Sequence, residues 1–156
     1  MGQQRWVRGA VFVGLIVTGA VSVALVSQQR AVTASTARAA WETRIQVVER
    51  ALERDDVSAA IYFWRDAYGE AWRSRQWEAL FAVGETARRI DQVSRGRSFL
   101  PEARHAYLEA LFRARTLRSH EGMRRVATAF EELGDAEVAE HARSMASPSS
   151  ARQAER

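Results

Sequence analysis

Few side chains in this sequence could carry out chemistry, and their spacing does not form a catalytic site. None of the three histidines, His105, His120 and His141, belongs to the His-Glu-x-x-His pattern that places two zinc ligands on one helical turn. Glu137 and His141 are four residues apart and could share a metal ion, but such a pair on an exposed helix is more often solvated. The chain has no cysteine, which excludes thiol nucleophiles and zinc thiolates.

The sequence also lacks a glycine-rich loop that could cradle phosphate groups. Such a loop needs several glycines close together, so that backbone N–H groups can approach the phosphates. Beyond the first apolar stretch, Gly84, Gly96, Gly122 and Gly134 are each isolated. We therefore expect a protein that is not an enzyme and that has no cofactor and no metal site.

An aromatic stripe is a candidate binding surface. Trp64, Tyr68, Trp72 and Trp77 follow one another at short spacing toward a turn. Burying these rings would stabilise the core of a small domain. An exposed groove of the same rings could hold a partner's apolar side chains or a partner helix. Core packing is the simpler interpretation for the stripe, but Trp72 and Trp77 lie close to the turn and are expected to be partly exposed.

Arginines gather in the second half of the chain. Residues 88–125 contain ten arginines and four acidic residues, whereas residues 131–140 are acidic. This pattern suggests either a surface for an anionic partner or ordinary pairing along helices, since three acidic residues precede an arginine by four positions. These pairs are Glu85 with Arg89, Glu109 with Arg113, and Glu121 with Arg125.

Aromatic and basic residues together give a set of hypothetical contacts with a protein partner. The net charge of +4 does not by itself indicate nucleic acid, because Arg5, Arg8 and Arg30 supply +3 of it and the chain from residue 37 onward is nearly neutral. We therefore expect a protein partner and no nucleic acid. The predicted partner-binding residues are Trp72, Trp77, Arg113, Arg118, Arg124 and Arg125.

The first hydrophobic stretch, residues 9–29, predicts a transmembrane helix. It contains no charged residue. At about 1.5 Å per residue it is long enough to cross a hydrocarbon core of roughly 30 Å. Small side chains at every fourth position could let a second helix approach closely, which is a hypothesis for a homodimer within the membrane. This stripe consists of Ala10, Gly14, Thr18 and Ser22.

The same stretch could also be a secretory signal peptide, since Arg5 and Arg8 precede it and cleavage after Ala34 or Ala39 is conceivable. Its length exceeds the usual signal core of about 7–15 residues, so an uncleaved anchor is favoured. We expect the basic tail at residues 1–8 to be cytoplasmic and the domain after the span to lie outside. The absence of lysine and asparagine suggests a GC-rich gene and therefore a bacterial source. In a bacterium, the predicted span would lie in the inner membrane.

After a linker at residues 30–36, apolar residues at helical spacing predict an all-α domain at residues 37–146. Its helices are expected at about residues 37–54, 58–74, 77–90, 101–117, 119–133 and 135–146. Asp56, Ser119 and Asp135 are predicted N-caps, Pro101 suits a first helical turn, and Gly134 is predicted to end a helix. Residues 147–156 are expected to be a disordered tail.

Internal similarity suggests repeated helical hairpins, because residues 66–90 can be laid over residues 109–133. Residues 54–61 with Trp64 and Ala67 resemble the start of a second helix in tetratricopeptide-like repeats. A second set of residues resembles the first helix of such a repeat, the glycine that ends this helix and the small residue that follows. It comprises Met123, Val126, Ala127, Phe130, Gly134, Asp135 and Ala139. The two comparisons imply different pairings of the helices, and an irregular helical bundle is the alternative.

This resemblance implies an antiparallel array of about five to six helices that binds other proteins. The leading hypothesis is a membrane-anchored scaffold or assembly factor of an envelope or secretion-related complex. One alternative is an accessory or regulatory subunit held in a membrane complex mainly through its span. Another is a cleaved secreted enzyme or ligand carrier.

Overall fold

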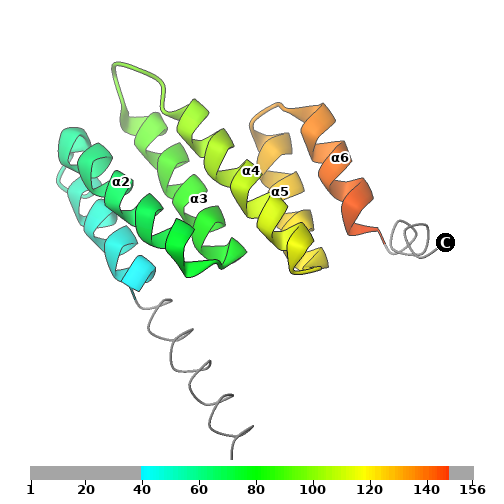
Figure 1. The fold of residues 1–156 in the computed structure, drawn as a ribbon. Coiled ribbons are helices and arrows are strands. Elements are labelled where there is room, and N and C mark those ends of the chain that lie inside the picture. Colours follow the sequence, from blue (N-terminus) through cyan, green and yellow to red (C-terminus); the bar gives the residue numbers. More distant parts are fainter. Residues whose placement is uncertain (1–39, 148–156) are drawn as a thin grey trace, which may run out of the picture. The chain divides into compact units, whose positions relative to one another are not determined.

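The computed structural model describes residues 40–147, and these residues form six helices and no strand. The first helix occupies residues 40–52. Short connections make successive helices run in alternating directions (Figure 1). The prediction of an all-α domain is confirmed for these residues. The helices that follow the first are α2 (Val57–Ser74), α3 (Trp77–Val93), α4 (Leu100–Thr116), α5 (His120–Glu132) and α6 (Ala136–Ala146).

Several predictions concern residues outside the described range. They are the basic tail at 1–8, the span at 9–29, the linker at 30–36 and the end of the tail at 148–156. The stripe of small residues from Ala10 to Ser22 lies there as well. Within residues 40–147, no helix is both long enough and apolar enough to cross a membrane.

Local turn chemistry sets the ends of the helices as predicted. The Asp56 carboxylate accepts a hydrogen bond from Ala59 N–H at 2.9 Å, and the Ser119 hydroxyl accepts one from Gly122 N–H at 3.1 Å. These two caps satisfy N–H groups that have no partner within a helix. Gly134 ends α5 in the left-handed conformation, with φ +79°.

Asp135 occupies the predicted N-cap position of α6, but its side chain makes no capping hydrogen bond. It accepts hydrogen bonds from Arg104 of α4 instead, at 2.6 Å from Nε and 3.3 Å from Nη2. The predicted cap is therefore replaced by a charged bridge between α4 and the α5–α6 turn. A two-pronged contact of this kind between a guanidinium and a carboxylate fixes both position and orientation.

The helices pair into hairpins. α3 has its most extensive contacts with α4, and α5 has its most extensive contacts with α6, whereas the α2–α3 and α4–α5 contacts are smaller. The helix at residues 40–52 lies beside α2 in Figure 1. This arrangement makes α2 the second helix of the first hairpin. The two similar stretches, residues 66–90 and 109–133, each begin in one hairpin and end in the next.

Glycine residues permit two close approaches between helices. A Cβ atom on Gly84 of α3 would lie 2.5 Å from Cε1 of Tyr107 on α4. A Cβ atom on Gly122 of α5 would lie 2.7 Å from the Cβ atom of Ala114 and 2.8 Å from the ring of Trp77. The hydrogen side chain at both positions therefore allows α4 and α5 to pack closely on their neighbours.

A buried tyrosine connects this packing to charged groups. Tyr107 is fully buried, and its hydroxyl donates a hydrogen bond to Glu85 Oε1 at 2.5 Å. Burial raises the pKa of Tyr107, and the bond to Glu85 raises it further, so the phenol stays protonated and remains a donor. Arg88 lies 3.7 Å from Glu85 and also pairs with Glu132 of α5. The network therefore joins α3, α4 and α5.

The longest connection in the domain, residues 94–99, is held by Asp91. Its Oδ1 accepts hydrogen bonds from the Ser98 hydroxyl at 2.7 Å and from Phe99 N–H at 2.6 Å. Phe99 is thereby placed in the core, where its ring meets the ring of Trp64 edge-on at a centroid distance of 4.9 Å. Burial alone would raise the pKa of Asp91, but these hydrogen bonds outweigh it and lower the pKa.

We predict that Gly84→Ala destabilises the protein although alanine favours helices. The added methyl group would collide with Tyr107, and overpacking of this kind costs about 1–3 kcal/mol. Gly69→Ala is the matched control, because a Cβ atom there would meet only the flexible end of Arg73 at 3.7 Å. The control should gain about 0.5–1 kcal/mol. Urea unfolding followed by circular dichroism measures both, and equal stability of the two variants would contradict the packing described.

We also predict that Asp91→Asn lowers the melting temperature at pH 7. Because the folded-state pKa of Asp91 lies below its ordinary value of 3.8, its stabilising contribution is complete above that pH and is lost as the pH falls through the lower value. The difference between variant and wild type should therefore shrink at about pH 2. Thermal unfolding at both pH values tests this, with the exposed Asp66→Asn as control. An equal difference at both pH values would show that ionisation of Asp91 is not involved.

Candidate functional site

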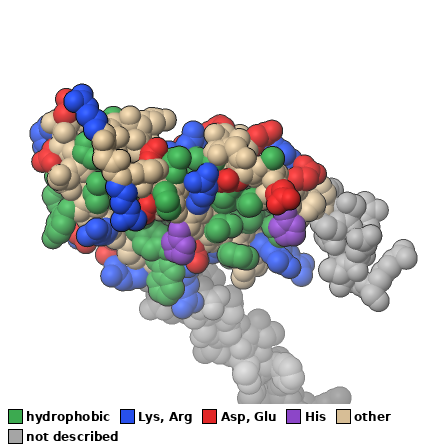
Figure 2. Space-filling model, turned by 90° about the horizontal axis from the view of Figure 1, so that it is seen from above, with side chains coloured by type: hydrophobic (Ala, Val, Ile, Leu, Met, Phe, Trp, Pro, Cys, Tyr) green, Lys and Arg blue, Asp and Glu red, His purple; other side chains and the backbone are tan. Residues whose placement is uncertain are grey.

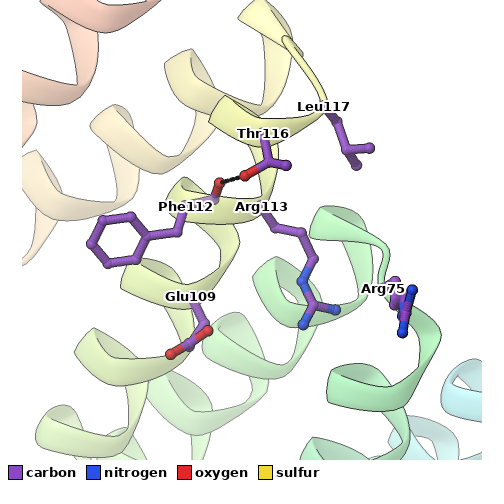
Figure 3. Close-up of a pocket in the computed structure, with 6 residues that line it drawn as sticks. All are labelled: Arg75, Glu109, Phe112, Arg113, Thr116 and Leu117. Atoms are coloured by element: carbon purple, nitrogen blue, oxygen red, sulfur yellow. Dashed lines mark hydrogen bonds between the residues drawn. The ribbon is translucent and has the colours of Figure 1, made fainter.

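An open groove lies between the end of α2 and the outer side of α4 (Figure 3). Its volume is about 350 Å³. Arg75, which follows the last residue of α2, forms one side, and the last turns of α4 form the other. We call this site the α2–α4 groove. It is lined by Arg75, Glu109, Phe112, Arg113, Thr116 and Leu117.

Two of the predicted partner-binding residues meet at this groove. Arg113 Nη1 donates a hydrogen bond to the backbone oxygen of Trp72 at 2.9 Å, and its guanidinium carbon lies 5.9 Å from the centroid of the Trp72 ring. The cation therefore satisfies a carbonyl near the C-terminus of α2 and also contacts the ring. Trp72 remains 54% exposed, as predicted. In Figure 3, Arg113 extends from α4 toward Arg75.

Large apolar side chains are exposed at the groove because the inner face of α4 is built largely from alanine. Phe112 is 59% exposed and Leu117 is 57% exposed. Leu108, one turn before Phe112, is 36% exposed. The residues of α4 that pack inward are Ala103, Ala106, Tyr107, Ala110, Leu111 and Ala114. The helix predicted at residues 101–117 ends slightly earlier, because α4 ends at Thr116 and Leu117 already lies in the turn.

The prediction that Trp77 is partly exposed is also wrong. Trp77 is only 5% exposed, and its ring packs against Gly122 of α5 and against Phe81 at a centroid distance of 6.4 Å. Arg125 covers this cluster, with its guanidinium carbon 4.4 Å from the centroid of the Phe81 ring. Trp77 therefore belongs to the core, and Arg125 is engaged with core rings on another side of the domain from the groove.

The other two predicted arginines do not line the groove. Arg118 is exposed in the turn between α4 and α5, one residue after Leu117, and has φ +53°. Arg124 lines a separate shallow hollow of about 420 Å³ with Thr128 and Arg143. The structure thus places Trp72 and Arg113 together, and it separates Trp77, Arg124 and Arg125 from them.

Tertiary contacts replace the expected pairing along helices. In the described part of the chain, none of the three predicted pairs of acid and arginine four residues apart forms an ion pair. Arg89 pairs with Glu49 of the first helix. Arg113 binds the backbone of α2, and Arg125 lies over Phe81. The arginines of this region therefore join helices to one another more than they decorate single helices.

Polar aromatic side chains lie between α2 and α4, next to the groove residues Glu109 and Arg113 but outside the lining. The rings of Tyr68 and His105 lie 5.9 Å apart between α2 and α4. Burial raises the pKa of Tyr68, and the nearby Glu109 carboxylate raises it further, while Arg113 lowers it. Tyr68 therefore stays neutral in the physiological range. Within residues 40–147, no group of three His, Cys, Asp or Glu side chains could hold a metal ion.

Five of the six lining residues were not predicted as partner contacts, namely Arg75, Glu109, Phe112, Thr116 and Leu117. Phe112 could have been found from the sequence. It lies four residues after Leu108, so the two share a face, and that face is distinct from the alanine-rich one. Arg75 could not have been found in this way, because its place beside α4 depends on how two hairpins pack.

The comparisons with known proteins give no relative for this chain. No protein-family model matches the sequence, and no curated protein and no solved structure matches it either. The resemblance to tetratricopeptide-like repeats therefore stays a prediction.

We predict losses of stability of very different size for the two tryptophans near the α2–α3 turn. Trp77→Ala should lower the free energy of unfolding by about 3–5 kcal/mol, because it empties a packed site. Trp72→Ala should lower it by less than about 1 kcal/mol, because the ring is half exposed and loses only its contact with Arg113. Urea unfolding of the full chain in detergent measures both values. A cost for Trp72→Ala equal to that for Trp77→Ala would contradict the assignment of Trp72 to the surface.

Proposed function

We propose that this chain is a membrane-tethered helical-repeat protein that binds another protein through the α2–α4 groove and has no catalytic role. The observation that carries the proposal is the exposure of Phe112 and Leu117, at 59% and 57%, in one open groove, with the 54% exposed Trp72 in contact with the groove residue Arg113. Clustered apolar side chains rimmed by polar groups mark interaction sites on soluble domains. Tryptophan and arginine, both present here, are also the residue types that dominate binding energy at interfaces.

The architecture supports a tetratricopeptide-like interaction module. The two fragments that resemble such repeats occupy equivalent places, since residues 54–61 span the turn inside the first hairpin and residues 134–139 span the turn inside the third. Ala60 and Ala139 lie at the same distance after their N-cap residues, and both are fully buried. Small residues at these positions allow the helices of a hairpin to approach closely.

The predicted span supports a location at the membrane. Residues 9–29 are largely apolar, contain no charged residue and are flanked by arginines, which fits an anchor. A tethered module with a binding groove and no catalytic constellation fits a scaffold or assembly factor, and an envelope or secretion-related complex is the setting proposed.

Site-specific photocrosslinking tests the protein-binding role. A photoreactive phenylalanine analogue is placed at position 112 of the full chain in membranes of the source organism. We expect a discrete crosslinked product larger than the chain, because Phe112 lines the groove. Position 62 is the matched control, since Tyr62 is 64% exposed but does not line the groove. Equal crosslinking at both positions, or none at position 112, would contradict the proposal.

A further inference from the structure

We propose that the α2–α4 groove binds an acidic and apolar segment of another protein, an inference that rests on the protein-binding role above. Arg75 would hold a carboxylate of this segment, and Phe112 and Leu117 would contact its apolar side chains. The proposal follows from the charge of the groove, from the position of the exposed apolar residues along α4 and from the composition of the rest of the chain.

Arg75 is a cation without an acidic partner among the described residues, and it is exposed at the edge of the groove. Its backbone is left-handed, with φ 58°, a conformation that costs a residue with a side chain about 1 kcal/mol or more. Asp55 and Arg118 adopt the same conformation in their turns, with φ 56° and 53°, so what distinguishes Arg75 is its place in the lining of the groove. A guanidinium held at this rim presents two parallel N–H donors that match a carboxylate.

The surrounding charge favours the same ligand. Arg115 and Arg118 are exposed at the end of α4, close in sequence to the groove residue Leu117. Glu109 is the only acidic residue in the lining, and it lies about two helical turns before Leu117. Within the lining, two arginines, Arg75 and Arg113, therefore stand against one carboxylate. The opposite end of the domain, seen in Figure 2, mixes acidic and basic side chains.

The apolar residues lie along α4 and its C-terminal turn. Leu108 and Phe112 share a face of α4, and Phe112 and Leu117 line the groove together. At 1.5 Å per residue, residues 108–112 extend about 6 Å along the helix axis. A peptide segment lying along α4 could contact Phe112 and Leu117 in the groove and extend toward Leu108. A flat layer of lipid headgroups against the end of the domain would reach Leu117 but not Leu108.

The chain itself does not supply a matching segment beyond the described residues. Residues 1–39 contain four arginines and no acidic residue, and residues 148–156 contain two arginines and one glutamate. A second copy would offer the acidic stretch at residues 131–140, but four of its five carboxylates are already paired within the domain. These are Glu131 and Glu140 with Arg143, Glu132 with Arg88, and Asp135 with Arg104. A different protein is the occupant that the charges favour.

Peptide selection tests the inference. Random 12-residue peptides displayed on phage are selected against the full chain in detergent, and the enriched peptides are synthesised and measured by fluorescence polarisation. We expect enriched peptides that combine Asp or Glu with Leu, Phe or Trp. Arg75→Glu and Phe112→Ser should each weaken their binding about tenfold or more. Arg95→Glu is the matched control, because Arg95 is an exposed arginine in the α3–α4 connection, and it should leave binding unchanged.

Other outcomes would overturn the inference. Enrichment of basic or neutral peptides would refute the acidic ligand, while dependence of their binding on Phe112 would leave the proposed protein-binding role intact. Acidic peptides whose binding is unaffected by Arg75→Glu would refute the role of Arg75. Failure to enrich any peptide, together with binding of phosphatidylglycerol vesicles that Arg75→Glu abolishes, would assign the site to lipid. Self-association of the chain that prevents peptide binding, measured by light scattering, would assign the site to a second copy.

Discussion

The close approach of α4 to α3 is the contact on which the rest of the domain depends. Tyr107 packs directly over Gly84, where any larger side chain would collide with its ring. The Tyr107 hydroxyl donates a hydrogen bond to Glu85, the residue after Gly84 in α3. Arg88 pairs with both Glu85 and Glu132, and so connects α3 to α5. One buried aromatic residue thereby sets the distance between two helices and links both of them to a third.

The same constraint explains why a groove remains on the outside. The inner face of α4 consists largely of alanine and fits closely against its neighbours, so the bulky Leu108 and Phe112 have no place inside. On the other side of the groove, α2 is anchored to α3 by a hydrogen bond from Trp64 Nε1 to the Val83 carbonyl at 3.0 Å. α2 and α4 each pack on α3 and, in the described part of the chain, not extensively on each other. Arg113 crosses the gap between them.

Local sequence patterns predicted what depends on local physics. Helical periodicity placed all six helices, and the caps at Asp56 and Ser119 and the stop at Gly134 followed from turn chemistry. The failures depend on residues far apart in the sequence. Trp77 is buried because Gly122 leaves room for its ring, and Asp135 gives up its capping role to Arg104. The Arg75 side of the groove likewise exists only when two hairpins are packed together.

The central claim is that the exposed groove is covered by a protein in the cell. Because the chain has no cysteine, a single thiol at position 112 reports directly on access to the groove. In the purified full chain, the thiols of Phe112→Cys and Tyr62→Cys should react with a water-soluble maleimide at similar rates. In membranes of the source organism, the thiol of Phe112→Cys should be protected and that of Tyr62→Cys should stay reactive. Equal reactivity of Phe112→Cys in both preparations would contradict the claim.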